Sequence, residues 1–251
     1  TSIGCHTMLW NFRKNDYHDW VKAEGMAAKF PPIRASNKVV PVSIPVSAGG
    51  QYHSFQLGTG LHDSSAALIP YLAYFDEPFL LISTGTWCIS LNPFNQESLT
   101  PEELSQDCLC YLSYEGKPVK AARFFGGYEH EQAVKNLAEQ FGESGDFYKT
   151  IQISSRSDAA VAYLEFMRQL VEKQAVSTRL ALGKSPVRRI FVDGGFAQNN
   201  IYMTLLAGAF PEMEVCAAEV AQASALGAAL AIHPFWNDKP LPENLVSLKK
   251  Y

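Results

Sequence analysis

Apolar residues recur along the chain with two different periods, and together these periods predict a mixed α/β fold. Short apolar runs, typical of buried strands, lie at 79–82, 87–91, 109–114, 118–124, 188–195 and 214–218. Spacing typical of amphipathic helices occurs at 64–74, 128–141, 158–182, 200–210 and 224–232. In this order, the elements predict a mixed sheet flanked by helices, with antiparallel strands early and parallel strands late.

Two of the strand pairs are predicted to be β-hairpins. The first turns at Ser83-Thr84-Gly85-Thr86, where we expect the glycine to supply unusual backbone angles. The second turns around Glu115-Gly116-Lys117.

Residues 1 to about 48 do not resemble a self-contained unit. The stretch 2–12 could form a strand and 16–26 a short helix, which the prolines after Phe30 would end. After a turn signal at 47–50, the stretch 54–60 predicts the end of a strand that leads into the first long helix.

Charge and hydropathy make several classes of partner and location unfavourable for this chain. The formal net charge is -4, from 21 basic and 25 acidic residues without a run of like charges, which disfavours nucleic acid and anionic membranes as partners. No apolar segment approaches the roughly 20 residues of a membrane helix. The binding of a single nucleotide, in contrast to that of a nucleic acid, does not require a basic surface.

The five cysteines are scattered and show no spacing of a zinc site, so we expect reduced thiols in a cytoplasmic protein and no metal ligands. The chain begins Thr-Ser-Ile-Gly without a methionine or a signal region. We therefore expect a fragment, a processed product or a trimmed chain.

Two glycine-bearing loops are candidates for phosphate binding. The hairpin tip Thr84-Gly85-Thr86 offers backbone N–H groups and hydroxyls at close range, although an ordinary polar turn has the same residues. The second loop, "FVDGGFAQNN" (191–200), ends a strand at Gly194-Gly195 and enters a helix, where Asn199 or Asn200 would cap the helix or bind a ligand. The alternative for this second loop is that its glycines only permit a sharp turn from strand to helix and bind no ligand.

A third stretch, "LGTGLHDSSAAL" (57–68), places His62 and Asp63 at the start of a predicted helix. Asp63 could be the N-cap of that helix, which would stabilise it by roughly 1 kcal/mol. Alternatively, Ser64 or Ser65 caps the helix and leaves the carboxylate free as a base. Phosphoryl transfer tolerates a weak base, because positioning and charge stabilisation dominate that reaction.

Four motifs in the order "GLHDSSAAL", "LISTGTW", "FVDGGFAQNN" and "ASALGAAL" closely resemble the second domain of the FGGY carbohydrate kinases. The His-Asp pair and the "STGTW" hairpin are most similar to the rhamnulokinase and fuculokinase branch. The resemblance begins near Val39, and residues 1–38 resemble the last part of the first domain.

This resemblance implies an actin-like, ribonuclease-H-like ATPase fold, with ATP, Mg²⁺ and a small sugar bound between two domains. Asp63 matches the family's general base. His62 is a candidate for contact with the substrate, and a structural role in an apolar stretch is the alternative. The residues that match nucleotide-binding positions are Thr84, Gly85, Thr86, Gly194, Gly195, Gln198 and Asn199. For Gly227 in the last motif, helix packing and ligand contact are both open.

The resemblance also implies that about half an enzyme is present. We expect residues 1–48 to be the tail of a missing sugar-binding domain with a crossover, and 49–251 to be the ATP-binding domain. No acidic phosphate loop of the first domain occurs in residues 1–50, and the literal "FGGY" at 125–128 is interpreted only as a turn before a helix. A homodimer is left open.

The leading functional hypothesis is a kinase for a ketose or deoxyketose. A non-catalytic nucleotide-binding half that docks to another subunit is the alternative, and a chaperone- or actin-related ATPase is a third hypothesis.

Overall fold

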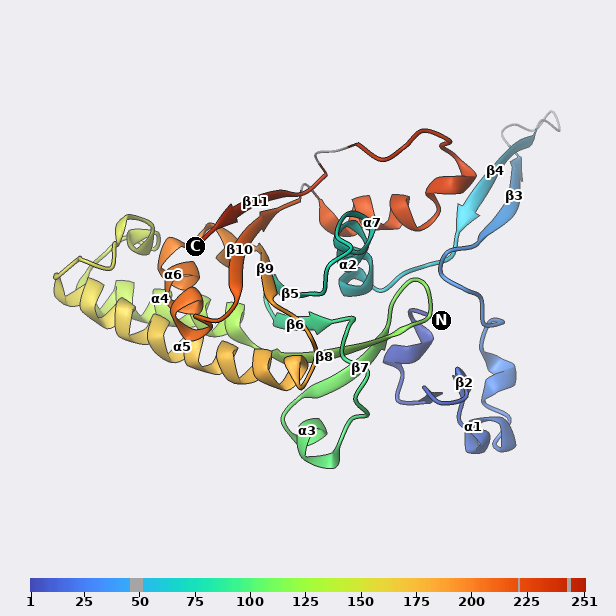
Figure 1. Cartoon of the computed structure of the whole chain (residues 1–251), viewed down its shortest axis with the longest axis horizontal. Coiled ribbons are helices and arrows are strands. Elements are labelled where there is room, and N and C mark those ends of the chain that lie inside the picture. The colour runs from blue at the N-terminus through green and yellow to red at the C-terminus, as the bar shows by residue number, and fades with distance from the viewer. Residues whose placement is uncertain (46–51, 221, 243–244) are drawn as a thin grey trace. The chain divides into compact units, whose positions relative to one another are not determined.

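The computed structural model describes residues 1–45, 52–220, 222–242 and 245–251 (Figure 1). Contacts divide the chain into two units, which are described separately. Unit 1 contains 1–75, 111–118 and 221–245, and unit 2 contains 76–110, 119–220 and 246–251. The turn signal at 47–50 and the domain boundary expected after residue 48 lie outside the described residues.

Unit 1 is built from short elements and two longer helices. Its helices are α1 (Asp19–Ala23), α2 (Asp63–Tyr74) and α7 (Ala223–Ala231), with single 3₁₀ turns at Gly4–His6, Ala27–Lys29 and His233–Phe235. Its strands form two antiparallel pairs, β1 (Trp10–Asn11) with β2 (Asp16–Tyr17) and β3 (Val39–Pro45) with β4 (Tyr52–Gly58).

A seven-stranded mixed sheet runs through unit 2. Its strands are β5 (Phe79–Thr84), β6 (Cys88–Asn92), β7 (Cys108–Leu112), β8 (Pro118–Phe124), β9 (Arg189–Gly194), β10 (Glu214–Glu219) and β11 (Ser247–Lys250). They lie in the order β11-β10-β9-β5-β6-β8-β7. The early pair β5–β6 is antiparallel, whereas β9 runs parallel to both β5 and β10. The predicted mixed sheet is therefore confirmed, with β11 as an unexpected antiparallel edge.

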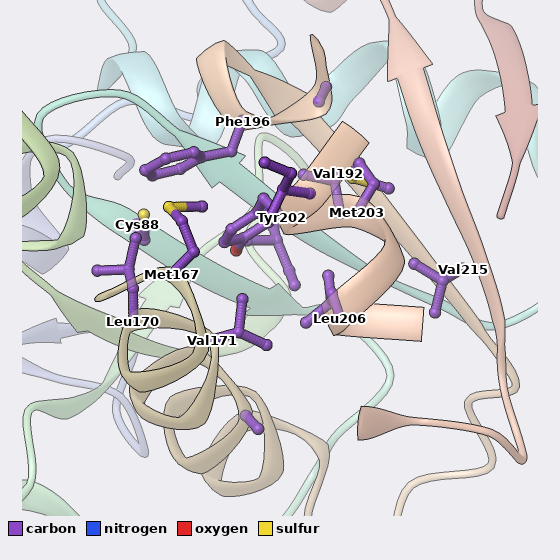
Figure 2. Packing of buried hydrophobic residues seen from close by; sticks show 14 of the residues in the cluster. Cys88, Met167, Leu170, Val171, Val192, Phe196, Tyr202, Met203, Leu206 and Val215 are labelled. Atoms are coloured by element: carbon purple, nitrogen blue, oxygen red, sulfur yellow. The ribbon is translucent and has the colours of Figure 1, made fainter. Parts of the chain in front are cut away.

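Four helices complete unit 2: α3 (Pro101–Ser105), α4 (Gly126–Phe141), α5 (Asp158–Leu182) and α6 (Asn200–Ala209), with 3₁₀ turns at Phe147–Thr150 and Gly195–Gln198. The predicted bounds of α5 are confirmed, because its apolar stripe is long and Ser157 caps it through the Ala160 N–H. Figure 2 shows this stripe, with Met167, Leu170 and Val171, facing residues of α6 across the buried core.

Buried hydrogen bonds fix α5 and α6 on the sheet. The Tyr202 hydroxyl on α6 donates to Gln174 Oε1 on α5 at 2.9 Å. The Gln174 amide in turn donates to Ser90 Oγ on β6 at 3.0 Å. Because buried polar groups are costly unless they are paired, this chain helps to specify one register for the helices. The start of α6, which borders the site described below, is thereby held in place.

The strand considered at 2–12 is wrong. Residues 4–6 form a 3₁₀ turn, and only Trp10 and Asn11 belong to a strand. Cys5 and Trp10 instead pack with Leu112 in a small apolar cluster. The alternation of apolar residues that indicated a strand therefore reflects local burial and not a ladder of hydrogen bonds.

Helices α2 and α7 approach each other closely at Gly227. A Cβ atom built on Gly227 would lie 1.8 Å from the carbonyl oxygen of Ala66. Only glycine allows this approach, because any larger residue would overlap with backbone that has no freedom to rotate away. Of the two roles left open for Gly227, the structure thus shows close packing.

We expect Gly227→Ala to destabilise the chain by about 2 kcal/mol, because α7 must move away from α2 to accommodate the methyl group. Urea unfolding measures the change. Gly208→Ala is the matched control, since Gly208 is also helical but has nothing within 4 Å of the position that a Cβ atom would occupy. This control should stabilise the chain by roughly 0.5–1 kcal/mol. Equal effects of the two substitutions would contradict the packing role.

None of the five cysteines, all of which the structure describes, forms a disulfide. Among the helices in the described part of the chain, none is long and apolar enough to span a membrane.

Candidate functional site

Two glycine turns of unit 2 are joined by the side chain of Thr84. This residue ends β5 and pairs with Gly194 at the end of β9. Its hydroxyl donates to the Asp193 carbonyl oxygen at 2.6 Å and accepts the Phe196 N–H at 3.0 Å. The Thr84 hydroxyl thus connects the hairpin to the β9 turn, and the expected contact of Thr84 with a nucleotide stays a prediction.

Gly194 adopts a conformation that L-residues rarely adopt. Its φ is +89°, and a Cβ atom would lie 1.9 Å from the Thr84 carbonyl oxygen. The neighbouring Gly195 has open space around the position of a Cβ. Gly194 is therefore needed for the turn, whereas Gly195 leaves bare backbone next to an open volume.

The hairpin tip differs from the expectation in one respect. Gly85 does not have a positive φ, so the expected unusual angles are wrong at this residue. The close approach comes from Gly127, where a Cβ atom would lie 1.8 Å from the Gly85 carbonyl oxygen. The Tyr128 N–H also donates to the Thr86 carbonyl oxygen at 3.1 Å. The "FGGY" stretch, interpreted as a turn before a helix, is instead the N-cap Phe125 and the first residues of α4, and it packs against the hairpin.

These turns border a cavity of about 450 Å³ in unit 2. Five of the predicted residues line it, namely Thr84, Gly85, Gly195, Gln198 and Asn199. Thr86 and Gly194 are not among the described lining residues. Asn200, which was considered as a cap or ligand contact, also lines it. The sequence did not indicate the remaining lining residues, which are Gly127, His130, Tyr148, Lys149, Ile151, Phe196 and Ile201. The helix at 128–141 was predicted, but its place at the cavity was not, because that place depends on the close approach of Gly127 to Gly85.

Asn199 is the N-cap of α6. Its Oδ1 accepts the N–H groups of Ile201 at 3.0 Å and Tyr202 at 3.1 Å. Its Nδ2 donates to the Tyr163 hydroxyl at 3.0 Å. Of the two roles considered for Asn199, the structure thus shows the cap, and a nucleotide contact stays a prediction. Gln198 is exposed at the cavity.

His130 lies at the same cavity and is held in its neutral form. Its Nε2 is 3.0 Å from the Tyr163 hydroxyl. Burial lowers the pKa of His130 to about 4, because protonation would place a charge where little water reaches it. The side chain therefore acts as a neutral hydrogen-bonding group at physiological pH.

Asp63 belongs to unit 1, where it is the first residue of α2. The N-cap position is occupied by His62, without a side-chain hydrogen bond, so the expected caps at Asp63, Ser64 and Ser65 are wrong. The Asp63 side chain is 80% exposed, and its Oδ1 accepts the Ser64 N–H at 2.7 Å. Its Oδ2 has no partner among the described residues. One carboxylate oxygen is therefore available to a substrate.

His62 packs between aromatic rings and the carboxylate. Its ring stacks on that of His6, with centroids 3.7 Å apart. Its Nδ1 lies 3.0 Å from Asp63 Oδ1, without the geometry of a hydrogen bond.

A second cavity, of about 580 Å³, lies in unit 1 and includes Asp63. Thr59 and Ser224, which carry hydroxyl groups, also line this cavity, as do small residues of α7. Ser224 Oγ also donates to the Asp63 carbonyl oxygen at 3.3 Å. His62 is not among the described lining residues, so its expected substrate contact stays a prediction. Most of the other lining residues are glycine, alanine, leucine or isoleucine, so the Asp63 carboxylate and the two hydroxyls are the polar side-chain groups at this cavity.

Comparisons with solved structures show the fold of unit 1 and unit 2 in sugar kinases. A carbohydrate kinase from Novosphingobium aromaticivorans matches with a TM-score of 0.72 and 24% identity, over 100% of this chain and 59% of that one. Xylulose kinase from Bifidobacterium adolescentis matches with a TM-score of 0.67 and 14% identity, over 99% of this chain and 57% of that one. Glycerol kinase from Plasmodium falciparum with ADP matches with a TM-score of 0.62 and 13% identity, over 92% of this chain and 54% of that one. The chain thus spans less than two thirds of these proteins.

No curated protein sequence matches the chain. Two family models do match it. The model "Carbohydrate kinase FGGY, C-terminal domain" matches residues 76–157, and "FGGY family of carbohydrate kinases, C-terminal domain" matches residues 144–232. Together they extend over more than half of the chain, which has the mixed sheet and helices expected of an actin-like ATPase fold. The chain therefore belongs to the FGGY family of carbohydrate kinases, in which it corresponds to the C-terminal domain.

Proposed function

We propose that the complete protein transfers the γ-phosphate of ATP to a hydroxyl of a small sugar. The acceptor would be a ketose or deoxyketose such as rhamnulose, fuculose or xylulose. In this proposal, unit 2 binds the nucleotide, Asp63 of unit 1 is the general base, and a first domain outside this chain supplies most of the sugar pocket. The observation that carries the proposal is the cavity bordered by glycine turns in a chain of this family.

The cavity of unit 2 fits a nucleotide by its backbone chemistry. At Gly194 and Gly127, a Cβ atom would overlap with the backbone of the hairpin, so the two turns and α4 approach as closely as glycine permits. Gly195 leaves the backbone next to the cavity uncovered. Bare backbone beside the start of a helix is a frequent binding place for phosphate groups. The apolar rings of Tyr148 and Phe196 offer a surface for the base.

Asp63 would act on the acceptor. As the sugar oxygen forms its bond to the γ-phosphorus, the bond from that phosphorus to the leaving ADP oxygen breaks, and Asp63 Oδ2 takes the proton of the hydroxyl. The exposure of the carboxylate and the lack of a described partner on Oδ2 support this role. Thr59 and Ser224 would orient the sugar.

Mg²⁺ would be held mainly by the phosphates, by water and by an acidic residue outside this chain. When it is bound, it neutralises the charge that develops on the phosphates. The described residues contain no cluster of three or more His, Cys, Asp or Glu side chains that could hold a metal ion by themselves.

We expect the 251-residue chain to bind ATP in calorimetry, and the complete protein to release ADP when a ketose or deoxyketose is added. If the complete protein binds ATP but does not turn it over with any ketose or deoxyketose that is tested, the alternative is favoured, namely a nucleotide-binding half that docks to another subunit. Failure of the chain to bind any nucleotide would contradict the proposal.

A further inference from the structure

The side chains of Asn199, Tyr163 and His130 form a chain of hydrogen bonds below the cavity of unit 2. Asn199 Nδ2 lies 3.0 Å from the Tyr163 hydroxyl, which lies 3.0 Å from His130 Nε2. Tyr163 is fully buried. The direction of each bond can be determined from its neighbours.

The orientation of the Asn199 amide is fixed by α6. Its Oδ1 accepts two backbone N–H groups of the helix, which only an oxygen can do. The Nδ2 group therefore faces Tyr163 and donates to its hydroxyl oxygen.

The position of the proton on His130 follows from this bond. The Tyr163 hydroxyl carries one hydrogen, and burial raises its pKa, so that hydrogen stays on the oxygen. His130 Nε2 is its one remaining partner among the described residues. If Nε2 carried a hydrogen, the buried hydroxyl hydrogen would have no acceptor, which is costly. In the neutral imidazole, Nε2 is therefore the acceptor, and Nδ1 carries the hydrogen.

The Nδ1–H group faces no acceptor in the described part of the protein. The hydrogen bond to Tyr163 is the one that His130 makes there, and Nδ1 is not among the buried atoms that lack a partner. Nδ1 is thus not fully buried, and His130 borders this cavity as well as a neighbouring one lined mainly by residues of α4. A ligand in the cavity can supply the acceptor.

The surroundings of His130 favour a flat ligand. Its ring makes edge-to-face contacts with Tyr148, at a centroid distance of 5.1 Å, and with Phe196, at 5.2 Å. Both aromatic residues line the same cavity. A neutral donor between aromatic rings suits a ring nitrogen of a purine better than a charged phosphate, which lies more favourably at the glycine turns.

We propose that His130 is a specificity-determining residue of the nucleotide site, whose Nδ1–H donates a hydrogen bond to a ring nitrogen of the purine base. This inference rests on the proposed binding of ATP. Tyr163 and Asn199 are positioning residues that fix the tautomer of His130, and Asn199 also links this tautomer to the start of α6.

The first test compares nucleotides that lack one ring nitrogen. Calorimetry of the 251-residue chain would use ATP and its 1-deaza, 3-deaza and 7-deaza analogues. We expect one analogue to bind about 3- to 10-fold more weakly than ATP, as the loss of a single hydrogen bond predicts. In His130→Gln, whose amide replaces Nε2 but not Nδ1, ATP should bind as weakly as that analogue, and the difference between the two should disappear. His233→Gln, outside the cavity, should behave as wild type.

Equal binding of ATP and all three analogues to the wild-type chain would overturn the proposal. An equal loss of affinity for every nucleotide in His130→Gln would also overturn it. Failure of the wild-type chain to bind ATP would instead contradict the proposed function, and with it the base contact.

The second test needs no nucleotide. Nitrogen-15 NMR distinguishes a protonated from an unprotonated ring nitrogen, and the His130 signals are those that disappear in His130→Gln. We expect hydrogen on Nδ1 and none on Nε2 at neutral pH, and Tyr163→Phe should allow both tautomers. A hydrogen on Nε2 in the wild-type chain would overturn the assignment.

Discussion

Asp63→Asn in the complete protein is expected to lower kcat for sugar phosphorylation by about 10²- to 10⁴-fold, the usual contribution of a general base. The amide keeps the shape of the carboxylate and the bond from the Ser64 N–H, but it does not accept a proton from the sugar hydroxyl. Affinity for ATP should remain unchanged, because the proposed nucleotide site belongs to unit 2. Sugar-dependent ADP release and nucleotide calorimetry measure the two effects.

A matched control exists on α5. Asp158 is likewise the first residue of its helix and is exposed, so Asp158→Asn removes a carboxylate from the same position relative to a helix dipole. We expect nearly unchanged turnover in this variant. Turnover of Asp63→Asn close to that of Asp158→Asn would show that Asp63 is not the base.

The second large effect concerns Gly194. Gly194→Ala should destabilise the chain by roughly 3–5 kcal/mol, because strain at positive φ adds to an overlap of the methyl group with the backbone at Thr84. The turn must move to relieve this overlap, so the chain should lose affinity for ATP by at least about 10-fold, since two or more phosphate contacts would shift with the turn. Urea unfolding and calorimetry measure the two changes.

Two other glycines are controls for this substitution. Gly208→Ala tests the general effect of an added methyl group in unit 2 and should be neutral or stabilising for ATP binding and folding. Gly195→Ala should leave stability nearly unchanged, because its surroundings are open. Normal stability and ATP binding in Gly194→Ala would contradict both the strain and the role of the turn.

Local patterns predicted most elements of the mixed sheet well. The apolar runs at 79–82 and 188–195 were confirmed as β5 and β9, and the positive φ of Gly116 at +80° agrees with the second predicted hairpin. These elements depend on short-range turn chemistry and on continuous apolar runs, both of which are visible in a sequence. The same patterns failed at 2–12, where burial of a few residues by distant segments produced an apparent strand.

The candidate site was predicted in part for a similar reason. Gly85, Gly195, Gln198 and Asn199 come from loops with a recognisable composition, and the structure places all four at one cavity. His130 and Tyr148 come from α4 and the turn after it, and nothing in their own neighbourhood indicates that the sheet brings them to these loops.

The linear order of residues was enough to predict the family, the succession of elements and the glycine turns, because these depend on local propensity and on motifs in a fixed order. The roles of individual groups, in contrast, became visible only in the folded chain. There, Thr84 joins two turns, Asn199 caps α6, and Gly127 rather than Gly85 needs to be small. The cap at Asn199 is local and was one of the roles that the sequence left open, but the bond from Asn199 to Tyr163 and the roles of Thr84 and Gly127 depend on residues that are distant in the chain. Such contacts arise only when the strands and helices pack.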